Sequence, residues 1–212
     1  MGEESSTTIA DRTLSALKDS HALLEGHFIL SSGLHASRYV QCVQLLQFPD
    51  MAQQVCSDLA SKIKEDFHGE NSINVVLGPA MGAVTFSYEL ARAMGVRGIF
   101  AERNSEGQFA LRRGFHIQPG ERVLVAEDVV TTGKSASEVI AMLAQMGVNV
   151  VAAASIVNRS GLTAPFGDTL PYFSCIDLDI PSYDPKECLT EIKRMTEEYG
   201  KPYKPGSRPS ID

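Results

Sequence analysis

The chain is poor in the residue patterns that would assign it quickly to a specialised class of protein. Its 212 residues contain no tryptophan and only four cysteines, Cys42, Cys56, Cys175 and Cys188. These cysteines lie far apart and form no C-x-x-C pair, which argues against both a disulfide framework and a cysteine zinc site. We therefore interpret them as buried or incidental thiols in a reducing compartment.

An excess of positive charge is also missing. The formal net charge is −7 at pH 7, whereas a general nucleic-acid binder carries a basic surface. An acidic protein can still bind a phosphorylated small molecule through a local basic site. No apolar run approaches the roughly 18 residues that a membrane helix needs, and the polar start "MGEESSTTIADRT" does not resemble a signal peptide. We expect a cytoplasmic protein that binds neither nucleic acid nor membrane.

Short apolar runs rich in β-branched residues alternate with helical stretches from residue 73 onward. These runs predict strands at 73–78, 98–102, 122–127, 148–157 and 172–178. They are apolar on both faces, as are strands buried between two layers of helices. Helices are predicted at 82–94 and 134–146, each followed by a glycine that can end a helix. Strand–helix–strand units in series indicate an α/β fold with a central parallel sheet flanked by helices.

Three more helices are predicted outside this alternating part. They are expected at 9–24, at 49–66, and in the last segment, where Asp184-Pro185 would begin a C-terminal helix. The final stretch, 201–212, is rich in proline, glycine and serine and is expected to be a loose tail. Neither an internal repeat nor a linker interrupts the chain, so residues 1–212 are predicted to form one domain.

The segment "VLVAEDVVTTGKSASE" places acids and hydroxyl groups at the end of a predicted strand. Its Gly-Lys-Ser is not a nucleotide P-loop, because that motif requires a glycine where Asp128 stands. Backbone N–H groups of residues 131–135 would instead converge at a helix N-terminus, where a phosphate fits. Glu127 and Asp128 would repel that phosphate and are better suited to hydroxyl groups of the same ligand, or to water around a magnesium ion. A ribose 5-phosphate satisfies both demands.

The thirteen residues "VLVAEDVVTTGKS" closely resemble the fingerprint of type I phosphoribosyltransferases, which bind 5-phosphoribosyl 1-diphosphate (PRPP). The resemblance implies a type I phosphoribosyltransferase fold. It also implies a PRPP site formed by Glu127, Asp128, Val129, Val130, Thr131, Thr132, Gly133, Lys134 and Ser135. The fingerprint occurs as well in regulators that bind PRPP without catalysis, so it identifies the ligand better than the reaction.

Three further stretches resemble orotate phosphoribosyltransferases. They are "LLEGHFILSSGLHASRYVQ" (23–41), "FAERNSEGQFALRRGF" (100–115) and "IVNRSG" (156–161). In that family the first forms a hood over the base, where backbone groups near Tyr39 and Val40 would contact orotate. The third matches the arginine that binds orotate, here Arg159, and Thr131 would touch the base side as well. A guanidinium at the edge of the sheet also suits a carboxylate on chemical grounds.

The second stretch matches a flexible catalytic loop, which we call the flap (residues 103–114). A mobile cationic flap suits a diphosphate, because its closure excludes water and strengthens charge pairing. The resemblance implies catalytic roles for Arg103 and Arg113 beside Glu127 and Asp128, with Arg103 also binding PRPP. Mg²⁺ is the expected cofactor, held mainly by substrate oxygens and water rather than by protein ligands. Related enzymes are homodimers in which the flap of one subunit covers its neighbour's site, which implies shared active sites here.

The implied reaction joins orotate to the ribose 5-phosphate of PRPP, giving orotidine 5′-monophosphate and pyrophosphate in pyrimidine biosynthesis. The loop "GPAMGAV" (78–84) would touch the diphosphate. Two alternatives stay open: a purine phosphoribosyltransferase of the same fold, and a non-catalytic PRPP-binding regulator. The five histidines are scattered along the chain and are interpreted as solvated side chains.

Overall fold

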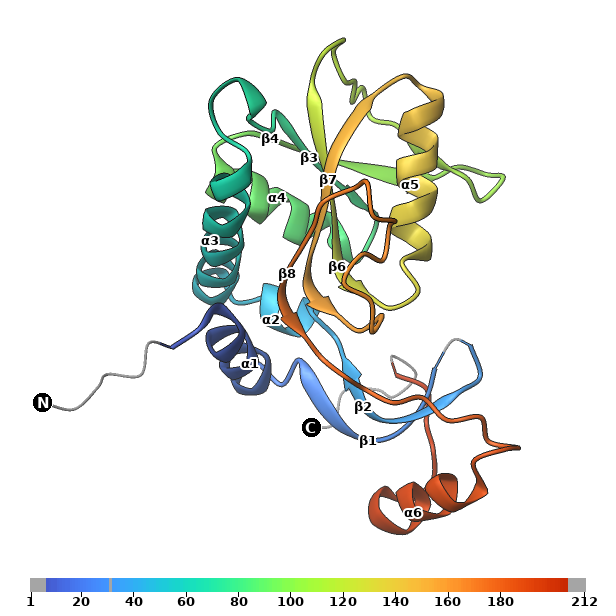
Figure 1. Ribbon diagram of the computed structural model, residues 1–212. Coiled ribbons are helices and arrows are strands. Elements are labelled where there is room, and N and C mark those ends of the chain that lie inside the picture. Colours follow the sequence, from blue (N-terminus) through green and yellow to red (C-terminus); the bar gives the residue numbers. More distant parts are fainter. Residues whose placement is uncertain (1–6, 31, 206–212) are drawn as a thin grey trace, which may run out of the picture.

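The computed structural model describes residues 7–30 and 32–205, so residues 1–6, 31 and 206–212 lie outside the described part. Its centre is a six-stranded sheet with the order β5-β4-β3-β6-β7-β8 (Figure 1). The strands are β3 (Val75–Pro79), β4 (Arg97–Arg103), β5 (Phe109–Leu111), β6 (Arg122–Val130), β7 (Asn149–Asn158) and β8 (Tyr172–Asp177). Neighbouring strands are parallel except for β5, which pairs antiparallel with β4. The predicted α/β fold with a central, mostly parallel sheet is confirmed.

Helices cover both faces of this sheet, which explains why its strands are apolar throughout. The helices α1 (Ile9–Asp19), α3 (Pro49–Asp66) and α4 (Ala83–Met94) lie on one face, and α5 (Lys134–Gln145) lies on the other (Figure 1). Alternate strand residues enter different cores: Val76 and Leu124 belong to the cluster under α3 and α4, whereas Val75 and Val123 belong to the cluster under α5. This alternation is the two-residue period of a strand, with both sets buried.

The strand order reverses between β3 and β6. The chain passes from β3 through α4 to β4 on one side of the sheet, and from β6 through α5 to β7 and then β8 on the other. Loops that leave the carboxyl ends of β3 and β6 therefore diverge and leave a crevice between them. A ligand site is expected at this point of the sheet.

A smaller unit lies at this end of the molecule, at the bottom of Figure 1. It contains an antiparallel hairpin of β1 (Leu23–Ile29) and β2 (His35–Val40), which is the hood. The short helix α2 (Val43–Leu46) connects β2 to α3, and the C-terminal helix α6 (Leu189–Tyr199) lies beside the hood. A single turn of 3₁₀ helix, Gly69–Asn71, precedes β3. Within the described residues, no helix is long and apolar enough to cross a membrane.

Two helix predictions were wrong in their boundaries. The helix expected at 9–24 ends at Asp19, because the Ser20 hydroxyl donates to the Ala16 carbonyl and His21 adopts a left-handed φ of 54°; the chain then continues into β1. The C-terminal helix begins at Leu189 rather than at Asp184-Pro185. The Asp184 side chain and carbonyl instead accept hydrogen bonds from the N–H groups of the next residues, which forms a turn.

Two other expectations were also wrong in part. The tail was expected to be loose from residue 201, but Tyr203 forms a bridge to Phe28 of β1; residues 206–212 lie outside the described part. The histidines were expected to be solvated, but the exposed fraction of His27 is 1% and that of His35 is 9%. Both errors come from tertiary packing of the C-terminal segment against the hood.

Candidate active site

Four segments far apart in the sequence meet at the point where the strand order reverses. β6 ends with Glu127 to Val130, the loop 78–84 follows β3, Arg159 follows β7, and Tyr39 and Val40 end β2 of the hood. The loop after β3 approaches the acids closely: a Cβ atom added to Gly82 would lie 3.3 Å from Asp128 Oδ1. A side chain at this position would be in tight contact with the carboxylate. The β3 loop and the acid pair therefore border one site.

The hood closes one side of a pocket of about 210 Å³, which we call the base pocket. Its lining residues come from β2, the turn into α2, the end of β6 and the start of the loop after β7. They are Tyr39, Val40, Gln41, Cys42, Val43, Asp128, Val129, Thr131 and Arg159. All residues that the sequence assigned to orotate are thus brought together with one of the two acids. A flat, singly charged base is of a size that fits this space.

Arg159 presents an unpaired positive charge to the base pocket. Its backbone N–H donates to the Val130 carbonyl at 2.7 Å, which fixes the residue to the end of β6. Its side-chain Nε is buried and has no hydrogen-bond partner among the described residues. Burial lowers the pKa of the guanidinium below its usual value, with Tyr39 acting weakly in the opposite direction. A buried, unpartnered guanidinium is costly, so this position is suited to an anionic ligand group.

Burial at the end of β6 disfavours the charged forms of both Glu127 and Asp128. Burial, followed by the neighbouring charge of Asp128, raises the pKa of Glu127 to about 8. Burial also raises the pKa of Asp128, although the Val129 backbone N–H partly offsets this. At neutral pH the pair therefore holds one proton between two carboxyl groups. This proton limits the repulsion between the two carboxyl groups. Ligand hydroxyl groups or a nearby cation would reduce the same repulsion.

The loop after β6 has the geometry of an anion cradle. Gly133 adopts a left-handed φ of 69° and directly precedes α5, and the Lys134 N–H lies 3.4 Å from the Thr132 hydroxyl. Thr131, Thr132 and Lys134 are exposed and Ser135 is partly exposed, so all are accessible to a ligand. The Val130 side chain is fully buried. Only the backbone of Val130 can take part in binding, and its carbonyl already accepts from Arg159.

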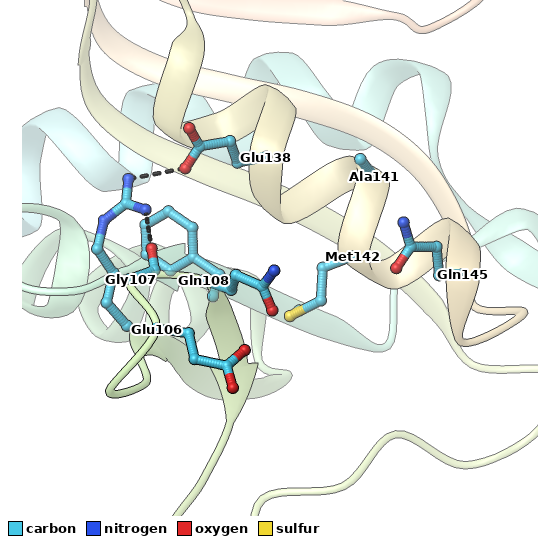
Figure 2. A pocket seen from close by; sticks show the side chains of 9 residues that line it. Glu106, Gly107, Gln108, Glu138, Ala141, Met142 and Gln145 are labelled. Atoms are coloured by element: carbon cyan, nitrogen blue, oxygen red, sulfur yellow. Dashed lines mark hydrogen bonds and ion pairs between the residues drawn. The ribbon is translucent and has the colours of Figure 1, made fainter.

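Neither flap arginine lines the base pocket, although Arg103 shares the Glu138 carboxylate with Lys134, which follows the loop after β6. Arg103 lies against α5 instead: its Nη2 is 2.7 Å from Glu138 Oε2, its Nη1 donates to the Gly107 carbonyl, and its guanidinium lies 4.2 Å above the Phe109 ring (Figure 2). These contacts border a separate pocket of about 350 Å³ between the flap and α5. Arg103 is therefore held away from the base pocket.

Arg113 is also engaged elsewhere. Its Nε lies 2.7 Å from Glu102 Oε2, and this hydrogen bond lowers the pKa of Glu102 below its usual value. Arg113 adopts a left-handed φ of 57° at the end of the flap. For either arginine to reach a diphosphate in the same chain, these ion pairs would have to break.

Sequence reasoning missed Cys42 and Val43 as pocket residues. The Cys42 thiol lies 3.7 Å from the Asp128 carbonyl, and burial raises the pKa of the thiol well above its usual value. A thiol that stays protonated is a packing group rather than a nucleophile. No pattern in the sequence marked these positions, because their place in the pocket depends on how the β2–α2 turn packs against β6.

A dedicated metal cage is absent from the described part of the chain, where no group of three or more His, Cys, Asp or Glu side chains is arranged to hold a metal ion. The adjacent carboxyl groups of Glu127 and Asp128 are the acidic donors at the site. This donor set fits a hard cation that keeps water and substrate oxygens as most of its ligands.

Comparison with known proteins identifies the family to which the chain is related. Residues 44–179 match the phosphoribosyl transferase domain family. The chain is 49% identical to an orotate phosphoribosyltransferase of Caldicellulosiruptor bescii, over 84% of this chain and 90% of the relative. It is 47% identical to one of Thermotoga maritima, over 91% of this chain and 96% of the relative.

Solved structures show the same fold. An orotate phosphoribosyltransferase of Mycobacterium tuberculosis in complex with inorganic phosphate superposes with a TM-score of 0.60 at 25% identity, covering 79% of this chain and 96% of the other. An adenine phosphoribosyltransferase of Saccharomyces cerevisiae superposes with a TM-score of 0.61 at 18% identity, covering 77% and 99%, which shows a common fold alone. By its sequence and its architecture, this chain belongs to the orotate phosphoribosyltransferases, within the phosphoribosyl transferase domain family.

Proposed function

We propose that the protein transfers ribose 5-phosphate from PRPP to orotate, giving orotidine 5′-monophosphate and pyrophosphate. The observation that carries this proposal is the Arg159 side chain, whose buried Nε has no hydrogen-bond partner among the described residues, in a pocket that also contains Asp128. Orotate bears a carboxylate that a guanidinium can bind with two hydrogen bonds. A purine base has no carboxylate and would leave the buried charge without a partner.

In this reaction the bond between the ribose C1 and the diphosphate oxygen breaks, and its electron pair leaves with the diphosphate. A ring nitrogen of orotate forms the new bond to C1 and loses its proton to pyrophosphate or water. Positive charge develops on the sugar ring, as in glycoside cleavage. Asp128, aided by Glu127, would hold the ribose hydroxyls and place negative charge beside that cation. The amides of residues 131–135 would hold the 5-phosphate.

Mg²⁺ is the proposed cofactor, and when bound it would neutralise charge on the diphosphate. The support in this chain is the acid pair with its shared proton, which can accept water or hydroxyl groups around the ion. Arg159 would fix orotate, and Tyr39 with Val40 would cover the base from the hood. These contacts exclude water from the reacting atoms.

A homodimer is proposed because of the flap and of an exposed apolar face on α4. Tyr88 is 66% exposed and Met81 is 81% exposed. Beside Tyr88 lies a pocket of about 440 Å³ lined by Val84, Thr85, Ser87, Gly98, Ile99, Phe100 and Phe115. Aromatic and methionine side chains are enriched at protein interfaces. A second copy on this face would cover these side chains and bring its flap to the site, where Arg103 and Arg113 would exchange their ion pairs with Glu138 and Glu102 for the diphosphate.

Complementation between variants tests the shared site. An Arg113→Ala chain and an Asp128→Asn chain, each inactive, should regain activity on mixing, because one site of each mixed dimer contains neither substitution. Failure to regain activity, with mixed dimers shown to form, would mean that the flap acts within its own chain.

The decisive assay for the proposed function is the loss of orotate absorbance when PRPP and Mg²⁺ are added. The wild-type protein should consume orotate, and Arg159→Ala should raise the KM for orotate about 10- to 100-fold, the size of a charge-assisted hydrogen bond. Arg97→Ala is the matched control, because Arg97 pairs with Glu121 at the opposite end of the sheet. Consumption of a purine instead of orotate would support the alternative transferase, and PRPP binding without turnover would support a regulator.

A further inference from the structure

The C-terminal segment forms backbone hydrogen bonds with the outer edge of each strand of the hood. A two-stranded hairpin is only marginally stable by itself, yet both outer edges of this one are paired. On β1, the Tyr203 N–H donates to the His27 carbonyl at 3.0 Å and the Ile29 N–H donates to the Tyr203 carbonyl at 2.9 Å. On β2, His35 and Tyr183 exchange two backbone hydrogen bonds of 2.8 Å. The C-terminal segment thus pairs with both strands of the hood.

A line of aromatic rings leads from this segment to the base pocket. The ring centroid of Tyr203 lies 5.1 Å from that of Phe28, and the Phe28 centroid lies 5.7 Å from that of Tyr39. Phe28 is fully buried between the other two. Since close-packed side chains transmit strain, we expect a change at Tyr203 to shift Tyr39, which lines the base pocket.

A buried histidine pair fastens α6 to the same hairpin. His27 Nε2 lies 2.7 Å from His35 Nδ1, and His27 Nδ1 lies 3.3 Å from the Thr196 hydroxyl of α6. The Thr196 hydroxyl donates to the Ile192 carbonyl at 2.8 Å, so it accepts from His27 Nδ1. The neutral His27 ring then accepts at Nε2 from the His35 Nδ1–H. The chain of hydrogen bonds orients both strands relative to α6.

We propose that residues 183–203 form a clamp that positions Tyr39 for binding of the base, with Tyr203 and Thr196 as positioning residues. This inference rests on the proposed function for its substrate. The hydrogen bonds and ring contacts given above join the clamp to the hood, and none of them is made with the loops after β3 and β6. The clamp should therefore affect orotate binding and leave PRPP binding unchanged, which a general loss of stability would not do.

Substitutions at Tyr203 test the clamp. Tyr203→Ala removes the ring from Phe28 but keeps the backbone, and it should raise the KM for orotate about three- to tenfold, the size of one aromatic contact. The KM for PRPP should change less than about twofold on the same argument. Tyr203→Phe keeps the ring and should restore most of the orotate affinity. Tyr199→Ala is the control for losing an aromatic ring from the same segment, because Tyr199 is exposed and is not one of the three rings that lead from Tyr203 to Tyr39.

Equal rises in both KM values, or none in the KM for orotate, would overturn the proposal. If Tyr203→Ala does not fold, Thr196→Val is the deciding variant, because it removes the hydroxyl that lies beside His27. It should raise the KM for orotate and leave the KM for PRPP unchanged. If the KM for orotate does not rise selectively, the clamp is refuted.

Failure of the proposed function can be recognised separately, because the wild-type protein would then consume no orotate. In that case amide hydrogen exchange, which needs no substrate, tests the clamp. Tyr203→Ala should speed exchange at residues 35–40 of β2 and leave residues 75–79 of β3 unchanged. Unchanged exchange in β2 would overturn the proposal.

Discussion

The acid pair at the end of β6 should reduce the stability of the protein in a pH-dependent way. Burial raises the pKa of Glu127 from 4.5 to about 8. Between these values the unfolded chain has lost the proton that the folded chain still holds, so stability falls as pH rises from about 4.5 to about 8. Above pH 8 both states are ionised and the loss is complete.

Replacing Glu127 by glutamine removes this loss, because the amide has the same shape and does not titrate. Each pH unit in the window corresponds to about 1.4 kcal/mol, so Glu127→Gln should gain about 3 kcal/mol over the wild type at pH 7. For a chain of this size that gain raises the Tm by roughly 6–12 °C. At pH 4.5 the two proteins should melt together. Activity should be lost at every pH, because a carboxylate beside the ribose is missing.

Thermal unfolding with a chelator, without substrate and at fixed protein concentration, measures this difference. Melting curves at pH 4.5, 6, 7 and 8 should show a gap between variant and wild type that widens with pH. Glu65→Gln, an exposed carboxyl on α3, is the control for loss of a surface charge. A gap of the same size at all pH values, or a variant less stable than the wild type at pH 8, would refute the reasoning.

Three further predictions follow from other parts of the structure. Gly133→Ala should raise the KM for PRPP at least about tenfold and leave the KM for orotate nearly unchanged. The Cβ of the alanine would lie 2.9 Å from the Phe166 ring, and the residue would have to keep a left-handed φ, so the anion loop would be distorted. Equal effects on both constants would contradict this. Tyr88→Asp should convert the proposed dimer to monomers in sedimentation experiments, since it places a charge on the apolar face of α4; an unchanged mass would contradict it. Burial and the neighbouring His35 lower the pKa of His27, so its contribution to stability is present above pH 6.5 and is lost as pH falls below that value. His27→Gln should flatten the fall in Tm between pH 6.5 and 5, and an equally steep fall would show that other groups cause it.

Much of the fold could be predicted from local patterns. Five of the six strands of the central sheet, all except β5, were found because each is an apolar run with β-branched residues, and α5 was found because an apolar stripe is followed by Gly147. Errors occurred where local pattern and tertiary contact disagree. The end of the first predicted helix became β1, because Leu23 to Ile29 find a partner strand in β2. The sequence contains no local signal for that pairing.

The candidate site was predictable in parts, for a related reason. Glu127, Asp128 and residues 131–135 form one continuous segment whose order alone indicates a sugar and a phosphate. Arg159 could be assigned to the same edge because parallel strands end together. The position of Arg103 could not be predicted: its ion pair with Glu138 depends on how the flap packs against α5.

The sequence by itself determined the sheet, the anion loop and the acid pair, because these depend on residues that are neighbours along the chain or follow the period of one strand. Only the tertiary structure decided which residues close the base pocket, that the buried Arg159 Nε has no partner within the described part of the chain, and that the C-terminal segment pairs with the hood. Those properties arise from contacts between segments that are far apart in the sequence, such as Cys42 with Asp128 and Thr196 with His27, and such contacts are set by the packing of the whole molecule.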